Sequence, residues 1–164
     1  MKNERVRVQT SIGVELDLPD GWELDDNDRP ICLRPRGVDT PVQISVIAHA
    51  ARGPGAPNEK SVLLVLGSIA QRLAGERYMT PGGERSGGAS LVRAEASAAN
   101  GSAVGWMDFW AHGSDPEHPD ARMFGAGVRQ WPDRVLVLTW IGPARLIDRC
   151  AEARQIFDSA DLIT

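Results

Sequence analysis

The sequence predicts an α+β domain with a mainly antiparallel β-sheet of about six to eight strands and two main helices, in the order ββββαββββα. Three features predict this class. Segments of alternating apolar and polar residues are joined by short turns, as in β-hairpins. Two segments repeat apolar residues at helical spacing. No GxGxxG or P-loop motif stands between a strand and a helix, so a parallel nucleotide-binding sheet is not expected.

Four strands are expected before the first helix. Val14, Leu16 and Leu18 alternate with acidic residues, and Pro19-Asp20-Gly21 ends that strand. The acidic stretch 23–28 is expected to be a solvated loop. The four expected strands cover residues 5–9, 14–18, 31–34 and 42–49.

Two helices are expected from apolar residues spaced three and four apart. The first follows a Gly/Pro loop and can be capped by Asn58 or Ser61. Its apolar stripe is formed by Val62, Leu66, Ile69 and Leu73. The last helix begins after Pro143, and its inward stripe is formed by Leu146, Cys150, Ala153 and Phe157. The Cys150 thiol is therefore expected in the core.

The strongest local signal is Asn100-Gly101, which lies between two alternating segments and is typical of a two-residue type I′ turn. This turn fixes the register of the hairpin. The expected pairs are Ala99 with Ser102, Ala94 with Met107, Val92 with Phe109, and Arg93 with Asp108. One face is then apolar and should meet the core. The other face carries Arg93, Glu95 and Ser97 beside Val104, Trp106, Asp108 and Trp110.

A second hairpin is expected between residues 122–130 and 134–141, with Pro132 in the turn. Tight closure places Gly125 opposite Trp140 and Gly127 opposite Leu138. The large side chains are then expected to lie over the glycines.

Length and composition limit the classes of protein. The 164 residues and 17.7 kDa predict a single domain over residues 1–164. No apolar segment reaches the roughly 18 residues of a membrane-spanning helix. The net charge of −4 argues against a nucleic-acid partner. Two cysteines do not make a disulfide framework, and the N-terminus lacks the apolar stretch of a secretory signal, so a cytoplasmic location is expected, with a processed exported form as the alternative.

The candidate binding residues are Trp106, Asp108, Trp110 and Arg93. Two indoles at alternate positions of one strand could form a platform for a protein partner, with Arg93 and Asp108 as a charged pair in its middle. In the alternative interpretation a helix covers this face, the tryptophans form a second core layer, and Arg93 neutralises Asp108 across the strands.

Two polar clusters contain residue types that bind metal ions. Histidines and carboxylates crowd the segment 112–120 (HGSDPEHPD), but its prolines favour an extended, solvated connection. The cluster Asp25-Asp26-Asn27-Asp28 lacks the glycine and distal glutamate of a calcium loop. No catalytic residue, metal or cofactor is therefore expected.

The chain resembles the Mog1/PsbP-like fold and its bacterial relatives, including the DcrB-like group and small actinobacterial lipoproteins. The matching features are Leu18-Pro19-Asp20-Gly21-Trp22, the helix near residues 60–75 and the closing strand–Gly142-Pro143–helix unit. Members include a nuclear-transport factor, a photosystem II accessory protein and chaperones for secreted effectors. The resemblance implies an antiparallel sheet between helices and a non-enzymatic, accessory or chaperone-like domain that binds another protein.

Two other functions remain as alternatives. One is a domain that binds a small ligand between the sheet and a helix. The other is a metal-dependent hydrolase that uses the segment from His112 to Asp120.

Overall fold

The computed structural model describes residues 4–27, 29–36, 43–50, 57–75, 77–79, 85–87, 89–111, 122–143 and 146–163. The helices are α1 (Glu59–Gly75) and α2 (Ile147–Asp158). The first five strands are β1 (Arg5–Gln9), β2 (Val14–Pro19), β3 (Trp22–Asp25), β4 (Ile31–Pro35) and β5 (Gln43–Ala50). The remaining strands are β6 (Arg77–Met79), β7 (Arg85–Gly87), β8 (Ala89–Ala99), β9 (Ser102–Ala111), β10 (Arg122–Gln130), β11 (Arg134–Pro143) and β12 (Asp161–Leu162).

The centre of the fold is a seven-stranded antiparallel sheet in the order β3-β4-β5-β11-β10-β9-β8. A second, three-stranded sheet has the order β1-β2-β12, and β6 pairs with β7. The predicted α+β class with an antiparallel sheet is confirmed. The first two strands, however, leave the main sheet and form the smaller one.

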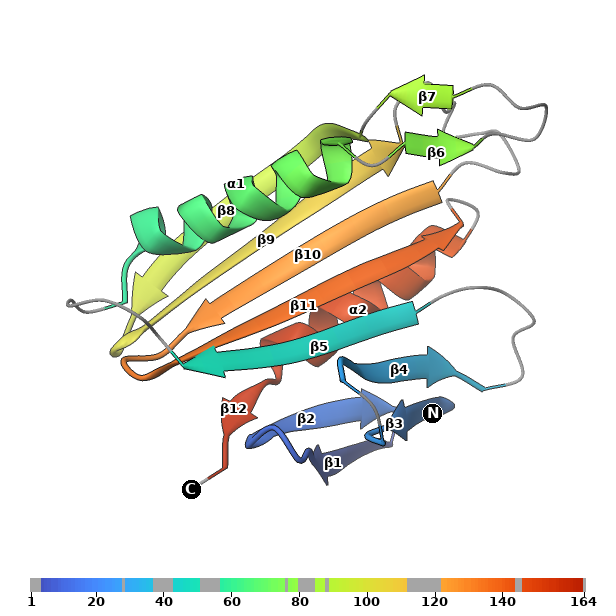
Figure 1. The fold of residues 1–164 in the computed structure, drawn as a ribbon. Helices are drawn as coiled ribbons and strands as arrows, with labels where there is room; N and C mark the ends of the chain where they lie inside the picture. The colour runs from blue at the N-terminus through green and yellow to red at the C-terminus, as the bar shows by residue number, and fades with distance from the viewer. Residues whose placement is uncertain are drawn as a thin grey trace.

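The two helices lie on opposite faces of the large sheet (Figure 1). Helix α1 packs on β8, β9 and β10, where Val62, Leu66 and Ile69 meet Met107, Phe124, Ala126 and Val128. Helix α2 packs on β10, β11 and β2, so the small sheet shares the second face with it. Among the described residues, that second core contains three fully buried aromatic side chains: Trp106, Trp140 and Phe157. The sheet therefore lies between two separate apolar layers.

The turn Leu18-Pro19-Asp20-Gly21-Trp22 connects the small sheet to the large one. Gly21 has a φ of +84°, a conformation that side chains other than glycine rarely adopt. Trp22 then enters the core with 5 % of its surface exposed, and its Nε1–H donates to Glu152 Oε2 at 2.7 Å. This contact joins the start of β3 to α2.

The hairpin predicted at Asn100-Gly101 is confirmed. Both turn residues have positive φ, as a type I′ turn requires. Ala99 pairs with Ser102, Ala94 with Met107, and Arg93 with Asp108. Beyond Arg93 the register shifts through a bulge, so Leu91, and not Val92, lies opposite Phe109. The prediction for Val92 is wrong because the bulge inserts one extra residue into β8.

The second hairpin has the predicted register, with Gly125 opposite Trp140 and Gly127 opposite Leu138. The side chains that fill the space above these glycines come from elsewhere. Trp106 of β9 lies over Gly125 and Gly127, and Phe157 of α2 lies over Gly127. The expectation that the opposite partners cover the glycines is therefore corrected.

Four strands were not expected from the sequence. β3 forms where an acidic loop over residues 23–28 was expected, because Trp22 to Asp25 pair with β4 while Glu23 and Asp25 stay exposed. β6, β7 and β12 are only two or three residues long. Strands of this length carry too little alternation to be recognised.

Candidate functional site

Strand β9 directs Trp106 and Asp108 toward α2. Trp106 is 1 % exposed and Asp108 is 8 % exposed. The Trp106 Nε1–H donates to Asp108 Oδ1 at 2.8 Å, and the Trp106 ring centroid lies 5.4 Å from that of Phe157 with the planes tilted by 44°. The hydrogen bond satisfies the buried indole N–H. Trp106 and Asp108 thus form one packed unit below α2.

Helix α2 seals this unit with charged and thiol groups. The Arg154 guanidinium carbon lies 5.4 Å from the Trp106 ring centroid, and Arg154 forms ion pairs with Glu95 of β8 and Asp158. Burial lowers the pKa of Arg154, but the hydrogen bonds to Glu95 and Asp158 outweigh it, so that pKa is raised overall. Cys150 Sγ lies 3.6 Å from Asp108 Oδ1, and the Cys150 thiol is buried as expected.

The prediction of an exposed platform is therefore corrected for Trp106 and Asp108, because both side chains are buried. Trp106 and Asp108 belong to the core layer under α2, as the alternative interpretation held. The backbone of Arg93 lies opposite Asp108, and that of Trp110 opposite Met123. The side chains of Arg93 and Trp110 lie outside the described residues. A role for them in binding stays a prediction.

The two polar clusters have different outcomes. The segment His112 to Asp120 lies outside the described residues. In the described part of the acidic cluster, Asp26 accepts hydrogen bonds from the backbone N–H and hydroxyl of Ser11 and pairs with Arg29 at 3.3 Å. Asp25 Oδ1 accepts from the Asn27 backbone and side chain. These contacts join the loop to the β1–β2 turn. No group of three metal-ligating residues comes together in the described ranges.

A different surface offers access to a partner: the α1-side face of the large sheet beyond α1. A helix about 10 Å wide covers only about two or three strands spaced about 4.8 Å apart, so one helix cannot cover seven. Among the described residues, no helix lies over β11, β5, β4 or β3 on this side (Figure 1). We call the α1-side surface of these four strands the open face.

The register of the ladders identifies the residues of the open face. Phe124, Ala126 and Val128 of β10 meet α1, so their β11 partners point to the same side. The β11 positions are Val135, Val137, Thr139 and Ile141, all half-buried. Val137 pairs with Ile47 of β5, whose side chain is 37 % exposed. The open face therefore has an aliphatic centre that continues the buried core under α1 to the surface.

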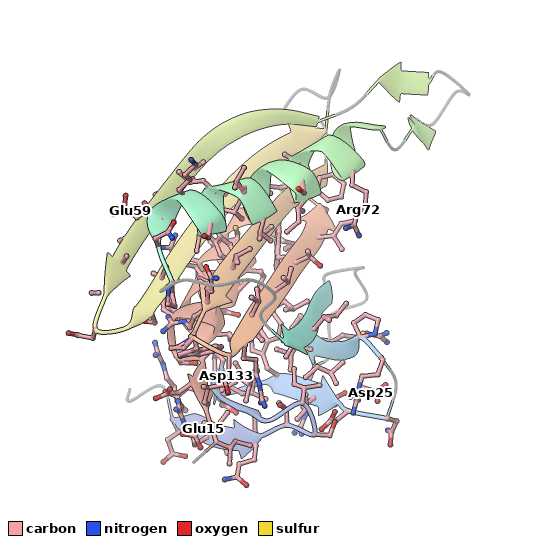
Figure 2. The ribbon with its side chains drawn as sticks, turned by 60° about the vertical axis from the view of Figure 1, so that its left-hand side comes forward. Glu15, Asp25, Glu59, Arg72 and Asp133 are labelled. Atoms are coloured by element: carbon pink, nitrogen blue, oxygen red, sulfur yellow. The ribbon has the colours of Figure 1, made fainter. Side chains whose placement is uncertain are left out.

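The open face becomes polar toward its outer strands. Thr139 pairs with Ser45, Ser45 with Cys32, and Cys32 with Asp25 across four strands. Cys32 is half-buried and Asp25 is exposed, and Figure 2 shows Asp25 at the edge of the sheet remote from α1. Glu23 and Arg34 are also exposed and lie opposite each other. An apolar centre with a charged margin is the composition typical of a protein interface.

Sequence reasoning missed this surface although its signal was present. In residues 135–141 both the odd-numbered and the even-numbered positions are mainly apolar, which indicates a strand with two apolar faces. The even positions Leu136, Leu138 and Trp140 lie under α2 and the small sheet. The odd-numbered residues of β11 remain half-buried because α1 packs on β8, β9 and β10, and the position of α1 cannot be read from the sequence pattern.

The interior between α2 and the sheet is filled by protein side chains. Trp106, Trp140 and Phe157 are each 1 % exposed or less and belong to one cluster with Cys150 and Ile156 of α2. The alternative of a small ligand held between this helix and the sheet therefore requires that these rings move.

Comparison with known proteins supports the fold. No protein-family model and no curated protein matches the sequence. The solution structure of cyanobacterial PsbP (CyanoP) from Synechocystis sp. PCC 6803 matches with a TM-score of 0.61 and 16 % identity, over 99 % of this chain and 94 % of that chain. The crystal structure of LpqN, involved in cell envelope biogenesis of Mycobacterium tuberculosis, matches with a TM-score of 0.57 and 15 % identity, over 97 % of this chain and 90 % of that chain.

The chain has the Mog1/PsbP-like fold, as the sequence resemblance implied. Sequence identities of this size show the fold alone. Within the described ranges, no helix has the length and apolar character needed to cross a bilayer.

Proposed function

We propose that this protein is a non-enzymatic accessory domain that binds another protein through its open face. The observation that carries the proposal is the aliphatic centre beside α1, where Ile47 is 37 % exposed and Val137 is half-buried. A partner that covers these side chains gains about 25 cal/mol for each Å² of apolar surface removed from water. Thr139, two residues from Val137 on the same face of β11, is half-buried and adds a hydroxyl group that can hydrogen-bond to the partner.

The fold supports an accessory role. LpqN, one of the two structural neighbours, is described as involved in cell envelope biogenesis, and CyanoP is a PsbP protein. These neighbours do not support the cytoplasmic location expected from the sequence. We include in the proposal that the domain works in the cell envelope.

The test compares two exposed aliphatic residues on different sheets. Ile47→Arg places a charge at the centre of the open face. Val6→Arg is the matched control, because Val6 is 60 % exposed and lies on β1 of the small sheet. Each tagged variant and the native chain are used to recover partners from the envelope fraction of the source cell.

The native chain and Val6→Arg are expected to recover the same protein, and Ile47→Arg at least about tenfold less of it, a loss of about 1.4 kcal/mol in binding free energy. Circular dichroism and thermal melting confirm that the variants are folded. Equal recovery by a folded Ile47→Arg would show that the open face is not the binding surface.

A further inference from the structure

The outer edge of β8 is a second surface available for an interaction. In the described part of the chain β8 ends the large sheet and pairs on one side only, with β9. It is 11 residues long, contains no proline, and is exposed at Ala94, Glu95 and from Ser97 to Ala99. Proteins usually protect such an edge with prolines, charged side chains, bulges or short strands. In β8 the bulge lies in the first half, before Arg93, and the one charge of the second half, Glu95, is paired with Arg154 of its own chain.

The hairpin geometry identifies which backbone groups are free to pair. In a two-residue hairpin, the residues that flank the turn form a hydrogen-bonded pair, and such pairs alternate along the ladder. Ala99 and Ser102 flank this turn, so the backbones at 99, 97 and 95 point toward β9. In agreement, the Glu95 carbonyl oxygen lies 3.2 Å from the position of a Cβ built on Gly105 of β9. The N–H and C=O groups of Ala94, Ala96 and Ala98 therefore point outward.

We infer that two copies of this chain associate through an antiparallel β8–β8 pairing with a two-fold axis at Ala96. The regular part of β8 extends from Arg93, where the bulge ends, to Ala99, where the turn begins. Ala96 is the middle residue of this stretch, and its backbone faces outward. A two-fold axis there pairs Ala96 with its own copy and Ala94 with the second copy's Ala98. The large sheets of both copies then form one continuous sheet.

Charges are compatible with this register. Glu95 lies opposite the second copy's Ser97, so no like charges are directly opposed. The Glu95 carboxylate already pairs with Arg154 of α2 in its own chain. A register centred on Glu95 would instead place two carboxylates opposite each other. The alternation of the strand thus favours the axis at Ala96.

Helix α1 fits this assembly and contributes to it. Because α1 packs on β8, β9 and β10, each copy of the helix is centred over β9. The two β9 strands are separated by three strand spacings, about 14 Å, whereas packed helices lie about 8–10 Å apart. The helices therefore do not collide, and their facing flanks leave a shallow gap that side chains can fill.

Leu63 lies on the flank that faces this gap. Figure 2 shows Arg72 extending from α1 toward β10 and β11. Leu63 is nine residues earlier, which is two and a half helical turns, so it lies on the opposite flank toward the free edge of β8. Leu63 is 46 % exposed in the single chain. In the proposed dimer this exposed leucine faces the second copy.

The experiment measures self-association and locates it. Sedimentation equilibrium from about 1 µM to about 1 mM is expected to show a rise from 17.7 kDa toward twice that mass. Hydrogen exchange at low and high concentration reports on single amides. The amides of Ala94, Ala96 and Ala98 are expected to exchange fast in the monomer and to gain protection in the dimer. A chain that stays monomeric, or a dimer in which these amides gain no protection, would overturn the inference.

Two variants and a control complete the test. Ala96→Pro removes an outward N–H without breaking a bond to β9, and Leu63→Arg charges the gap between the helices; each is expected to weaken self-association at least about tenfold. Val6→Arg, an equally apolar exposed position on the other sheet, should leave it unchanged. Dimers that persist in a folded Ala96→Pro, or equal losses in Leu63→Arg and Val6→Arg, would contradict the proposed interface. If Ala96→Pro does not fold, Leu63→Arg decides.

Discussion

Replacing Gly127 by alanine tests the contact between α2 and the sheet. A Cβ at Gly127 would lie 2.7 Å from Cδ2 and Cε2 of Phe157 and 2.8 Å from Cε3 of Trp106. Carbon atoms pack best at about 3.5–4.0 Å, so each contact is short by about 0.7 Å or more. Phe157 is 0 % and Trp106 1 % exposed, so neither ring can move into solvent.

The expected loss is worked out from two opposing effects. Overpacking of a rigid core costs about 1–3 kcal/mol, and contact with two rings places Gly127→Ala at the upper end. Alanine also restricts the unfolded chain more than glycine does, which stabilises the folded variant by about 0.5–1 kcal/mol. We therefore expect a net loss of about 2 kcal/mol in the free energy of unfolding. For a domain of this size that corresponds to about 4–8 °C in Tm.

The assay is urea denaturation together with thermal melting, and a second substitution identifies the cause. Phe157→Leu shortens the side chain that meets the new Cβ, so Gly127→Ala should cost at least about 0.5 kcal/mol less in that background. Gly127→Ala with unchanged stability would refute the packing described here. An equal loss with and without Phe157→Leu would show that Phe157 is not the obstacle.

Three further predictions follow from individual contacts. Gly67→Ala in α1, where a Cβ meets nothing within 4 Å, should raise the free energy of unfolding by about 0.5–1 kcal/mol in the same urea assay; a loss would show that the site is not open. Trp106→Phe removes an indole donor to the buried Asp108 and should lower stability by about 1–3 kcal/mol, while an unchanged value would contradict the hydrogen bond. Burial raises the pKa of Asp26, but hydrogen bonds from Ser11 and the charge of Arg29 outweigh it, so that pKa lies below its ordinary 3.8. A lowered carboxyl pKa stabilises the fold above about pH 4 and loses that contribution as pH falls further, so Asp26→Asn should show a smaller loss of stability on acidification than the native chain.

Local chemistry was sufficient to predict the hairpin at Asn100-Gly101. The turn residues fix a two-residue loop, and the register follows as far as Arg93. The bulge beyond Arg93 has no signal in the sequence, because Leu91 and Val92 are both apolar and either could face Phe109. β3 was missed for a different reason: pairing with β4 stabilises an acidic segment whose charges remain in water.

The candidate site shows where periodicity stops being informative. Alternation correctly placed Trp106 and Asp108 on one face of β9 and Gly105 and Met107 on the other. It could not show which face a helix would cover, because that depends on contacts between elements distant in the chain. Helix α2 covers Trp106, whereas α1 leaves Ile47 and the odd positions of β11 partly open.

Site-specific photo-crosslinking in the source cell tests the central claim most directly. Thr139 lies on β11, on the side of the open face nearest α1, with Ala126 of β10 and Ser45 of β5 as its neighbours across the strands, so a photoreactive phenylalanine there lies beside the aliphatic centre that the partner is proposed to cover. The same group at Val6 on β1 is the control. We predict a covalent adduct with one cellular protein from position 139 and none from position 6. No adduct at 139 in a folded protein, or the same adducts from both positions, would contradict a binding role for the open face.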